Sequence, residues 1–231
     1  MISLHPDVLT FDCYGTLIDW ERGLLAALQP LLHVHNVERS DADVLERFAA
    51  LESTAEAGPY RTYRSVLGLV LDGLGEHCGF TPTAEERHHF SSSVPSWPPF
   101  PDTAAGLRAL STRFKLAVIT NCDNDLFAGT AGHFPITFDE VVTAEHVGSY
   151  KPSAKNFEVA FERLAVPRDR ILHVAQSLYH DIAPARELGL TTVWVNRRGG
   201  DSGSGATPPA NAIPDHEVSD LRGLVELLGL L

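Results

Sequence analysis

The chain has 231 residues, of which 44% are hydrophobic, and it carries a formal net charge of -12. This length and composition predict a globular protein with a substantial core and exclude a disordered chain. The negative charge disfavours non-specific binding to nucleic acid or anionic lipid, because both depend on Lys and Arg that neutralise phosphate. We therefore expect neither nucleic acid nor a membrane as a partner, and a small anionic substrate would need local positive charge.

The cysteines and the absence of long apolar runs predict a cytoplasmic protein. Cys13, Cys78 and Cys122 are odd in number and form no CxxC pair, which favours a reducing compartment without structural disulfides. No apolar run reaches the roughly eighteen residues of a membrane-spanning helix. The first residues also lack the basic flank and cleavage site of a secretory signal.

Short apolar, β-favouring runs alternate with helix-length segments along much of the chain. These runs cover residues 8–11, 116–120, 171–175 and 192–196. The first run stops at Asp12, and Gly15 offers the backbone freedom for a sharp turn. The alternation predicts the α/β class, with a doubly wound, Rossmann-like parallel sheet and helical crossovers.

Helical spacing replaces the strand-like runs between the first strand and the middle of the chain. It dominates residues 24–33, 41–56 and 60–78, and Ser40 and Asp41 are candidate N-caps for the second of these segments. The proline-rich residues 95–101 then predict a return to the sheet, because proline cannot continue a helix. We predict a catalytic core of residues 1–18 and 94–231, with an inserted α-helical cap domain of residues 19–93.

Polar residues stand at four predicted strand ends: Asp12, Thr120 with Asn121, Lys151 beyond a short apolar run at 141–142, and Gln176 with Asp181. In open α/β sheets, ligands bind outside the carboxyl ends of the strands. A single turn aspartate would as readily cap backbone N–H groups. Four such strand ends at one edge predict a catalytic site.

These segments carry a family resemblance. FDCYGTL at residues 11–17 resembles the first motif of the haloacid dehalogenase superfamily, in which the leading aspartate is the nucleophile. ITN at 119–121, YKP at 150–152, and VAQS at 174–177 with Asp181 are similar to its second, third and, in a degenerate form, fourth motifs. Their order and spacing agree over almost the whole chain. The resemblance implies a hydrolase that forms a covalent ester at Asp12.

Two variations favour a dehalogenase over the phosphatases of the superfamily. Tyr14 stands where phosphatases carry an acid that protonates the departing alkoxide, and a halide needs no such proton. Gln176 replaces one of two acidic residues that hold Mg²⁺ in the phosphatases. The chain is most similar to the L-2-haloacid dehalogenases, which implies hydrolytic dehalogenation of short 2-haloalkanoic acids without a required cofactor.

This resemblance also implies residue roles. Asp12 attacks the halogen-bearing carbon, Lys151 balances its charge, and Asp181 positions or activates the hydrolytic water. Backbone N–H groups after Asp12 join the substrate-binding residues, which are Cys13, Tyr14, Thr16, Arg47, Thr120, Asn121 and Gln176. Arg47 resembles the arginine that receives the halide, with Arg61 and Arg64 as rivals. His180, beside Asp181, is either an isolated structural histidine or a group that tunes the water.

Two other functions stay open at this point. A Mg²⁺-dependent phosphatase of small phosphomonoesters would hold the metal on Asp12 and Asp181 together with waters. A catalytically reduced binding scaffold is the second alternative, because Phe157, Gln176 and Leu178 stand where the dehalogenase pattern has tyrosine, serine and asparagine. A homodimer is a further expectation.

Overall fold

The protein is described by a computed structural model that covers residues 5–199 and 205–230. Its centre is a six-stranded sheet in the order β3-β2-β1-β4-β5-β6, and every neighbouring pair is parallel. The strands are β1 (Val8–Phe11), β2 (Lys115–Thr120), β3 (Glu140–Thr143), β4 (Ile171–Ala175), β5 (Thr191–Val195) and β6 (His216–Val218). Because the strand order runs outward from β1 in both directions, the predicted doubly wound α/β class is confirmed.

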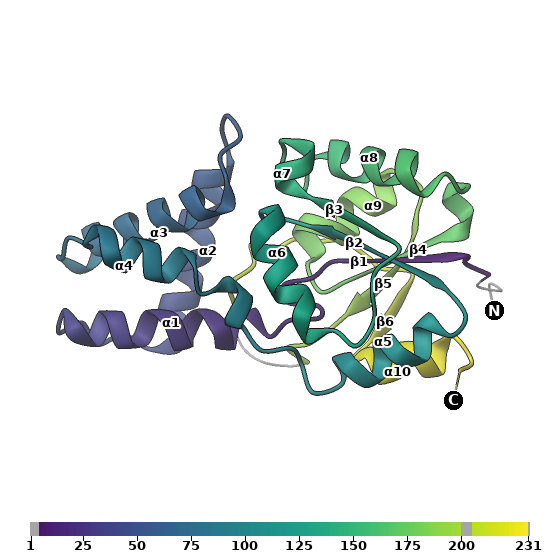
Figure 1. Cartoon of the computed structure of the whole chain (residues 1–231), viewed down its shortest axis with the longest axis horizontal. Helices are drawn as coiled ribbons and strands as arrows, with labels where there is room; N and C mark the ends of the chain where they lie inside the picture. The colour runs from purple at the N-terminus through teal and green to yellow at the C-terminus, as the bar shows by residue number, and fades with distance from the viewer. Residues whose placement is uncertain (1–4, 200–204, 231) are drawn as a thin grey trace.

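Helices cover both faces of this sheet (Figure 1). They are α5 (Thr103–Ser111), α6 (Asn124–Thr130), α7 (Ala144–Val147), α8 (Ala154–Leu164), α9 (Ala183–Glu187) and α10 (Leu221–Leu227). Short helical turns, η1 (Val94–Ser96), η2 (Ala131–His133), η3 (Arg168–Arg170) and η4 (Leu178–Ile182), join the main elements. The cover on both faces explains why all four residues of β1 are buried and why its sequence does not alternate.

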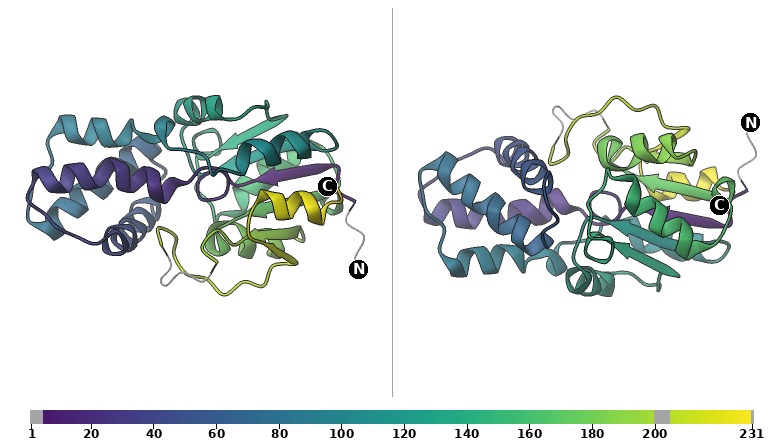
Figure 2. Two further views of the ribbon diagram at one scale, coloured as in Figure 1. Left: turned by 90° about the horizontal axis from the view of Figure 1, so that it is seen from below. Right: turned by 90° about the horizontal axis from the view of Figure 1, so that it is seen from above.

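Four further helices stand together beside the carboxyl ends of the strands, at the left of Figure 1 and in both views of Figure 2. They are α1 (Trp20–Val34), α2 (Asp41–Glu56), α3 (Tyr63–Cys78) and α4 (Ala84–Ser91). As predicted, the Ser40 side chain caps α2 by accepting from the N–H of Asp43. The Thr62 side chain caps α3 in the same way, so that helix begins later than the sequence pattern suggests.

The helical group meets the sheet domain through close packing at α1. A Cβ atom on Gly23 would lie 2.3 Å from Cγ of Trp97, which is fully buried in the proline-rich return segment. Only glycine allows this approach of the helix to the indole. In the part of the chain that the structure describes, no helix combines the length and apolar character needed to cross a membrane.

Candidate active site

A tight turn after β1 presents Asp12 at the edge of the sheet that faces the helical group. Gly15 has a φ of +95°, and its N–H donates to the carbonyl of Ile18. The carbonyl of Cys13 accepts from the N–H groups of Thr16 and Leu17. These three donors are therefore used within the turn itself.

The Asp12 carboxylate is held by a partner at each oxygen. The Thr16 hydroxyl donates to Oδ2 at 2.7 Å, and the Lys151 ammonium donates to Oδ1 at 2.9 Å. The N–H of Gln176 donates to the Thr16 hydroxyl at 2.8 Å and so orients it toward the carboxylate. Asp12 is thereby fixed in one position, which is what a nucleophile at a defined site requires.

Lys151 is buried and has each of its three ammonium protons engaged. Besides Asp12, Nζ donates to Oδ1 of Asp181 at 2.7 Å and to the carbonyl of Ile119 at 2.8 Å. Asn121 fixes the backbone at this lysine: its Oδ1 accepts from the N–H of Lys151 at 2.7 Å and its Nδ2 donates to the carbonyl of Lys151 at 3.1 Å. Asn121 therefore positions the lysine in addition to lining the cavity.

Asp181 lies in η4, directly beyond β4, and is supported by a buried histidine. Its Oδ1 is 3.1 Å from Nε2 of His173, and Nδ1 of His173 is 2.9 Å from the Thr10 hydroxyl on the neighbouring strand. His173 is not among the site residues predicted from the sequence. A signal for its role was present, because a polar side chain within a fully buried strand needs a hydrogen-bond partner.

The charges of these groups shift one another's pKa values. Burial raises the pKa of the Asp12 carboxyl, against the opposing effect of the Lys151 ammonium. Burial would also raise the pKa of Asp181, but Lys151 and His173 bring it below its ordinary value. For Lys151, the two carboxylates outweigh burial and raise the pKa. The ammonium therefore stays charged between the two carboxylates.

A small cavity of about 40 Å³ opens above Asp12. The described residues that line it are Asp12, Tyr14, Trp20, Glu52, Glu56, Tyr63, Asn121, Lys151, Ser177, His180, Asp181 and Thr207. The structure thus brings together five of the predicted site residues. His180 also lines the cavity, and burial lowers its pKa to about 4, so its ring is neutral at pH 7.

Tyr14, in the position of the phosphatase acid, has its hydroxyl engaged by other side chains. The hydroxyl lies 2.9 Å from that of Thr130 and accepts from the Cys122 thiol at 3.4 Å. Burial raises the pKa of Tyr14 well above its ordinary value. A phenol held in this way is a poor proton donor to a leaving group.

Four predicted binding residues, Cys13, Thr16, Thr120 and Gln176, do not line the cavity. Cys13 is fully buried, and Thr120 has a buried hydroxyl without a partner among the described residues. Gln176 contributes its backbone, whose carbonyl accepts from Nε1 of Trp194 at 2.8 Å. Thr16 and Gln176 therefore act through Asp12, as supports for its carboxylate.

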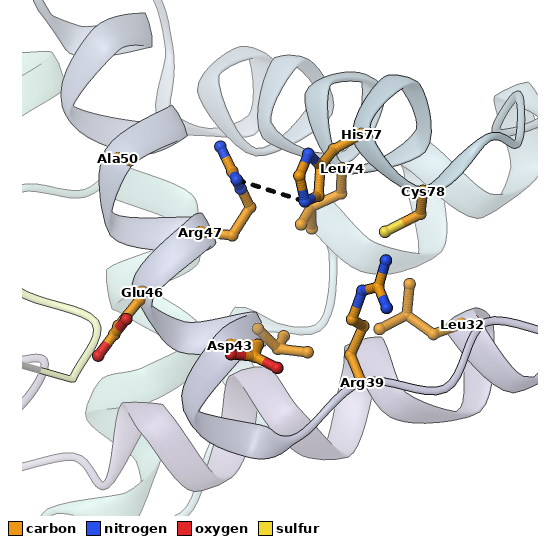
Figure 3. Close-up of a pocket in the computed structure, with 10 residues that line it drawn as sticks. Leu32, Arg39, Asp43, Glu46, Arg47, Ala50, Leu74, His77 and Cys78 are labelled. Carbon is orange, nitrogen blue, oxygen red and sulfur yellow. Dashed lines mark hydrogen bonds between the residues drawn. The ribbon is translucent and has the colours of Figure 1, made fainter. Parts of the chain in front are cut away.

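The arginines considered from sequence also lie away from this cavity. Arg47 lines a separate pocket of about 490 Å³ in the helical group, where its Nη2 lies 3.3 Å from Nε2 of His77 (Figure 3). Arg61 donates to the carbonyl of Ala55, and Arg64 pairs with Asp125. The sequence pattern suggested that Arg47 would reach the site above Asp12. The structure places it in a different pocket, and the geometry of the helix explains why.

The residues of α2 that line the cavity are Glu52 and Glu56, and Glu52 lies five positions after Arg47. At about 100° per residue, five positions turn the side chain by roughly 140° around the helix axis. Replacing Arg47 by alanine is therefore expected to change kcat/KM by less than about twofold. Steady-state kinetics of the two proteins check this expectation. A fall of about a hundredfold or more would place Arg47 at the site after all.

Two glutamates of α2, Glu52 and Glu56, occupy the cavity wall where an arginine was expected. Glu52 is buried, and the Tyr63 hydroxyl donates to its Oε1 at 2.8 Å. Burial raises the pKa of Glu52 to about 8. Burial and the neighbouring Glu52 carboxyl together raise the pKa of Glu56 well above its ordinary value.

The raised pKa of Glu52 predicts a pH-dependent gain in stability for Glu52→Gln. The unfolded chain releases this proton near the ordinary pKa of 4.5, whereas the folded chain keeps it to about 8. The wild type therefore loses stability as pH rises through that interval, whereas the Glu52→Gln variant does not, because its amide does not ionise. We expect thermal unfolding to show an advantage for the variant that grows between about pH 5 and pH 8.

The exposed Glu226 provides a matched control, because it lies on α10 and pairs with Arg222 at the surface. Glu226→Gln is expected to leave the pH dependence of the wild type unchanged. An advantage of Glu52→Gln that stayed constant with pH would show that the Glu52 carboxyl ionises normally in the folded protein.

Asp12 and Asp181 are the Mg²⁺ ligands of the phosphatase alternative. Their carboxylates do not present oxygens that are free to coordinate a metal ion. Asp12 uses one oxygen for Lys151 and the other for Thr16. Asp181 binds Lys151 through Oδ1, while its Oδ2 is sealed from solvent. Among the described residues, no three His, Cys, Asp or Glu side chains gather in a way that would hold a metal. This donor set does not fit octahedral Mg²⁺.

Comparison with known proteins identifies the family of this chain. The chain belongs to the haloacid dehalogenase-like hydrolase family, whose model matches residues 6–189. It is similar to (S)-2-haloacid dehalogenase H-109 of Pseudomonas putida, with 27% identity over 226 residues that cover 95% of this chain and 96% of the relative. The predicted membership of this enzyme superfamily is confirmed.

Solved structures of L-2-haloacid dehalogenases share the fold. The L-2-haloacid dehalogenase PA0810 superposes with a TM-score of 0.81 at 25% identity, covering 97% of this chain and all (100%) of the other. The enzyme of Xanthobacter autotrophicus with covalently bound chloropropionic acid superposes with a TM-score of 0.79 at 19% identity, covering 96% and 98% of the two chains.

Proposed function

We propose that this hydrolase removes halide from short 2-haloalkanoic acids through a covalent ester at Asp12. The observation that carries the proposal is the fixed Asp12 carboxylate, bound by Lys151 and Thr16, beside a Tyr14 whose hydroxyl is engaged elsewhere. A nucleophile without a neighbouring acid suits a leaving group that departs as a stable anion. The similarity to (S)-2-haloacid dehalogenases supports this choice of substrate class.

The proposed reaction has two steps. In the first, an Asp12 oxygen forms a bond to the halogen-bearing carbon, and the carbon–halogen bond breaks with both electrons leaving on the halide. In the second, water attacks the carboxyl carbon of the Asp12 ester, and the bond from that carbon to the substrate oxygen breaks. One proton of the water passes to that oxygen, which leaves as the hydroxyl of a 2-hydroxy acid, and the other proton is released to solvent as the Asp12 carboxylate is regenerated. Lys151 holds Asp12 in place, Asp181 anchors Lys151, and His180, which lines the cavity, positions the water. We further propose that residues 19–93 act as the cap over this site.

Halide release from the pure protein tests the proposal. L-2-chloropropionate and related acids are incubated with the enzyme, with and without EDTA, alongside a panel of small phosphomonoesters. The proposal predicts chloride release that EDTA does not affect. EDTA-sensitive phosphate release without halide release would instead support the phosphatase alternative.

Mass spectrometry distinguishes a dehalogenase or a phosphatase from a catalytically reduced binding scaffold. During turnover, the dehalogenase is expected to carry a substrate-derived mass on the peptide that contains Asp12. A protein that binds these acids without any adduct, and releases neither halide nor phosphate, would be the catalytically reduced scaffold.

A further inference from the structure

The walls of the active-site cavity come from opposite parts of the molecule. Asp12 lies at the carboxyl end of β1, and α2 stands on the facing side (Figure 1). Glu52 and Glu56 are four residues apart on α2, so their side chains share one helix face, and both line the cavity. When a carboxylate displaces a group from carbon, the leaving group departs on the side away from the nucleophile. A group displaced by Asp12 therefore departs toward α2.

The cavity offers little positive charge to receive that group. Lys151 is the single Lys or Arg among the described residues that line it. All three of its donors are used by Asp12, Asp181 and the carbonyl of Ile119. Arg47 faces a different pocket. A departing anion must therefore be stabilised by neutral donors on the α2 side.

Glu52 has the geometry of such a donor. Its exposed fraction is only 5%, and the Tyr63 hydroxyl donates to Oε1. No hydrogen bond within the described residues uses Oε2. In a neutral carboxyl group held in this way, the acid proton resides on Oε2 and is available to the cavity.

We propose that Glu52, in its neutral form, donates a hydrogen bond from Oε2 to the departing halide, with Glu56 as a second neutral carboxyl beside it. This inference rests on the proposed dehalogenase function and assigns its leaving-group site. The bond from Asp12 to carbon forms, the carbon–halogen bond breaks, and the halide keeps both electrons. Glu52 retains its proton throughout, so the step balances without another reactant.

The surroundings favour the neutral form of Glu52 at pH 7. Burial raises the pKa of Glu52 to about 8, and a carboxylic acid kept neutral by burial is an effective hydrogen-bond donor. The groups that face the α2 glutamates are Asp12, Lys151, Asp181, His180, Tyr14 and Tyr63. Of these, Lys151 has a raised pKa and His180 a pKa lowered to about 4, so neither changes charge between about pH 6 and pH 9.

Fluoride should gain most from this arrangement among the halogens. It is the strongest hydrogen-bond acceptor of the departing halides, and a hydrogen bond to a charged group is worth more than one between neutral groups. The structure thus points to a substrate class that includes 2-fluoroalkanoic acids. Ionised glutamates would repel the anion, so fluoride binding and defluorination should weaken as pH rises past about 8.

Fluoride binding tests the inference without depending on turnover. Sodium fluoride is titrated against the full chain at about pH 6 and about pH 9, and fluorine NMR linewidths measure binding. The wild type is expected to bind fluoride at least about tenfold more weakly at the higher pH. The double variant E52Q/E56Q carries amide donors that do not ionise, so its binding should be independent of pH. E226Q serves as the exposed control.

Equal pH dependence in the wild type and E52Q/E56Q would overturn the inference, as would wild-type binding that strengthens with pH. A second measurement uses Glu52→Leu, which removes the donor. Its ratio of kcat/KM for 2-fluoropropionate over 2-bromopropionate should fall by about tenfold or more, and an unchanged ratio would contradict the assignment. If the wild type releases no halide from any 2-haloacid, the proposed function fails, while the fluoride titration still decides the role of Glu52.

Discussion

Replacing Asp12 by asparagine is expected to lower halide release by about ten-thousandfold or more. The amide keeps an oxygen that can accept from Thr16 or Lys151, so the fold should survive, but it lacks the charged oxygen that attacks carbon. Steady-state halide release measures the loss, and circular dichroism checks the fold.

Asp7→Asn supplies a matched control for this substitution. Asp7 lies just before β1 and pairs with Arg170 in a partly exposed salt bridge, outside the cavity. This control should keep its turnover within about twofold of the wild type. Near-normal turnover of Asp12→Asn would remove the basis for a covalent mechanism at this residue.

Lys151→Met is expected to damage both stability and activity. The substitution leaves Asp12 and Asp181 buried without their shared counter-charge, and breaking a buried ion pair by removing one partner costs about 3–5 kcal/mol. Turnover should fall by about a thousandfold, because Asp12 loses the group that orients it. Thermal unfolding and halide release measure the two effects.

The pH dependence distinguishes this electrostatic cause from a simple loss of packing. Near about pH 4, a carboxyl can take up a proton in place of the missing ammonium, so the destabilisation of Lys151→Met should shrink. Lys155→Met is the control, because Lys155 is exposed and its ammonium donates to the carbonyl of Val147. A destabilisation of equal size at pH 4 and pH 7 would contradict the charge argument.

The sheet and the candidate site residues at its strand ends could be predicted because their signals are local. Each apolar run ends at the position where a polar residue begins, and the carboxyl ends of parallel strands meet at one edge. Asp12 and Lys151 were found in this way, and the structure places them 2.9 Å apart. The class of fold and the family follow from the same pattern.

The residues on α2 could not be placed from one helix alone, because the face that meets the active site depends on how the helices pack on the sheet. Arg47 was expected there from a short sequence pattern, and it faces another pocket. A usable signal was nevertheless present. Val44, Phe48 and Glu52 are buried at steps of four residues, which puts Glu52 on the buried stripe of the helix.

The hydrogen bonds that hold the Asp181 carboxylate depend on how the strands pair, and the sequence did not specify this pairing at the level of single residues. His173 lies opposite Thr10 in the register of β4 and β1, and this pairing completes the hydrogen bonds from Thr10 through His173 to Asp181. A histidine in an otherwise apolar strand predicts a buried partner, but only the register identifies which one.

A single turnover in heavy-oxygen water tests most directly whether Asp12 forms an ester. With enzyme in excess over L-2-chloropropionate, hydrolysis of the ester places the solvent oxygen on the Asp12 carboxylate, and the product carries the original light oxygen of that side chain. Mass spectrometry of the Asp12 peptide should therefore show the heavy label. Label found only in the 2-hydroxy acid product, with an unlabelled Asp12 peptide, would mean that water attacks the substrate directly and would contradict the mechanism.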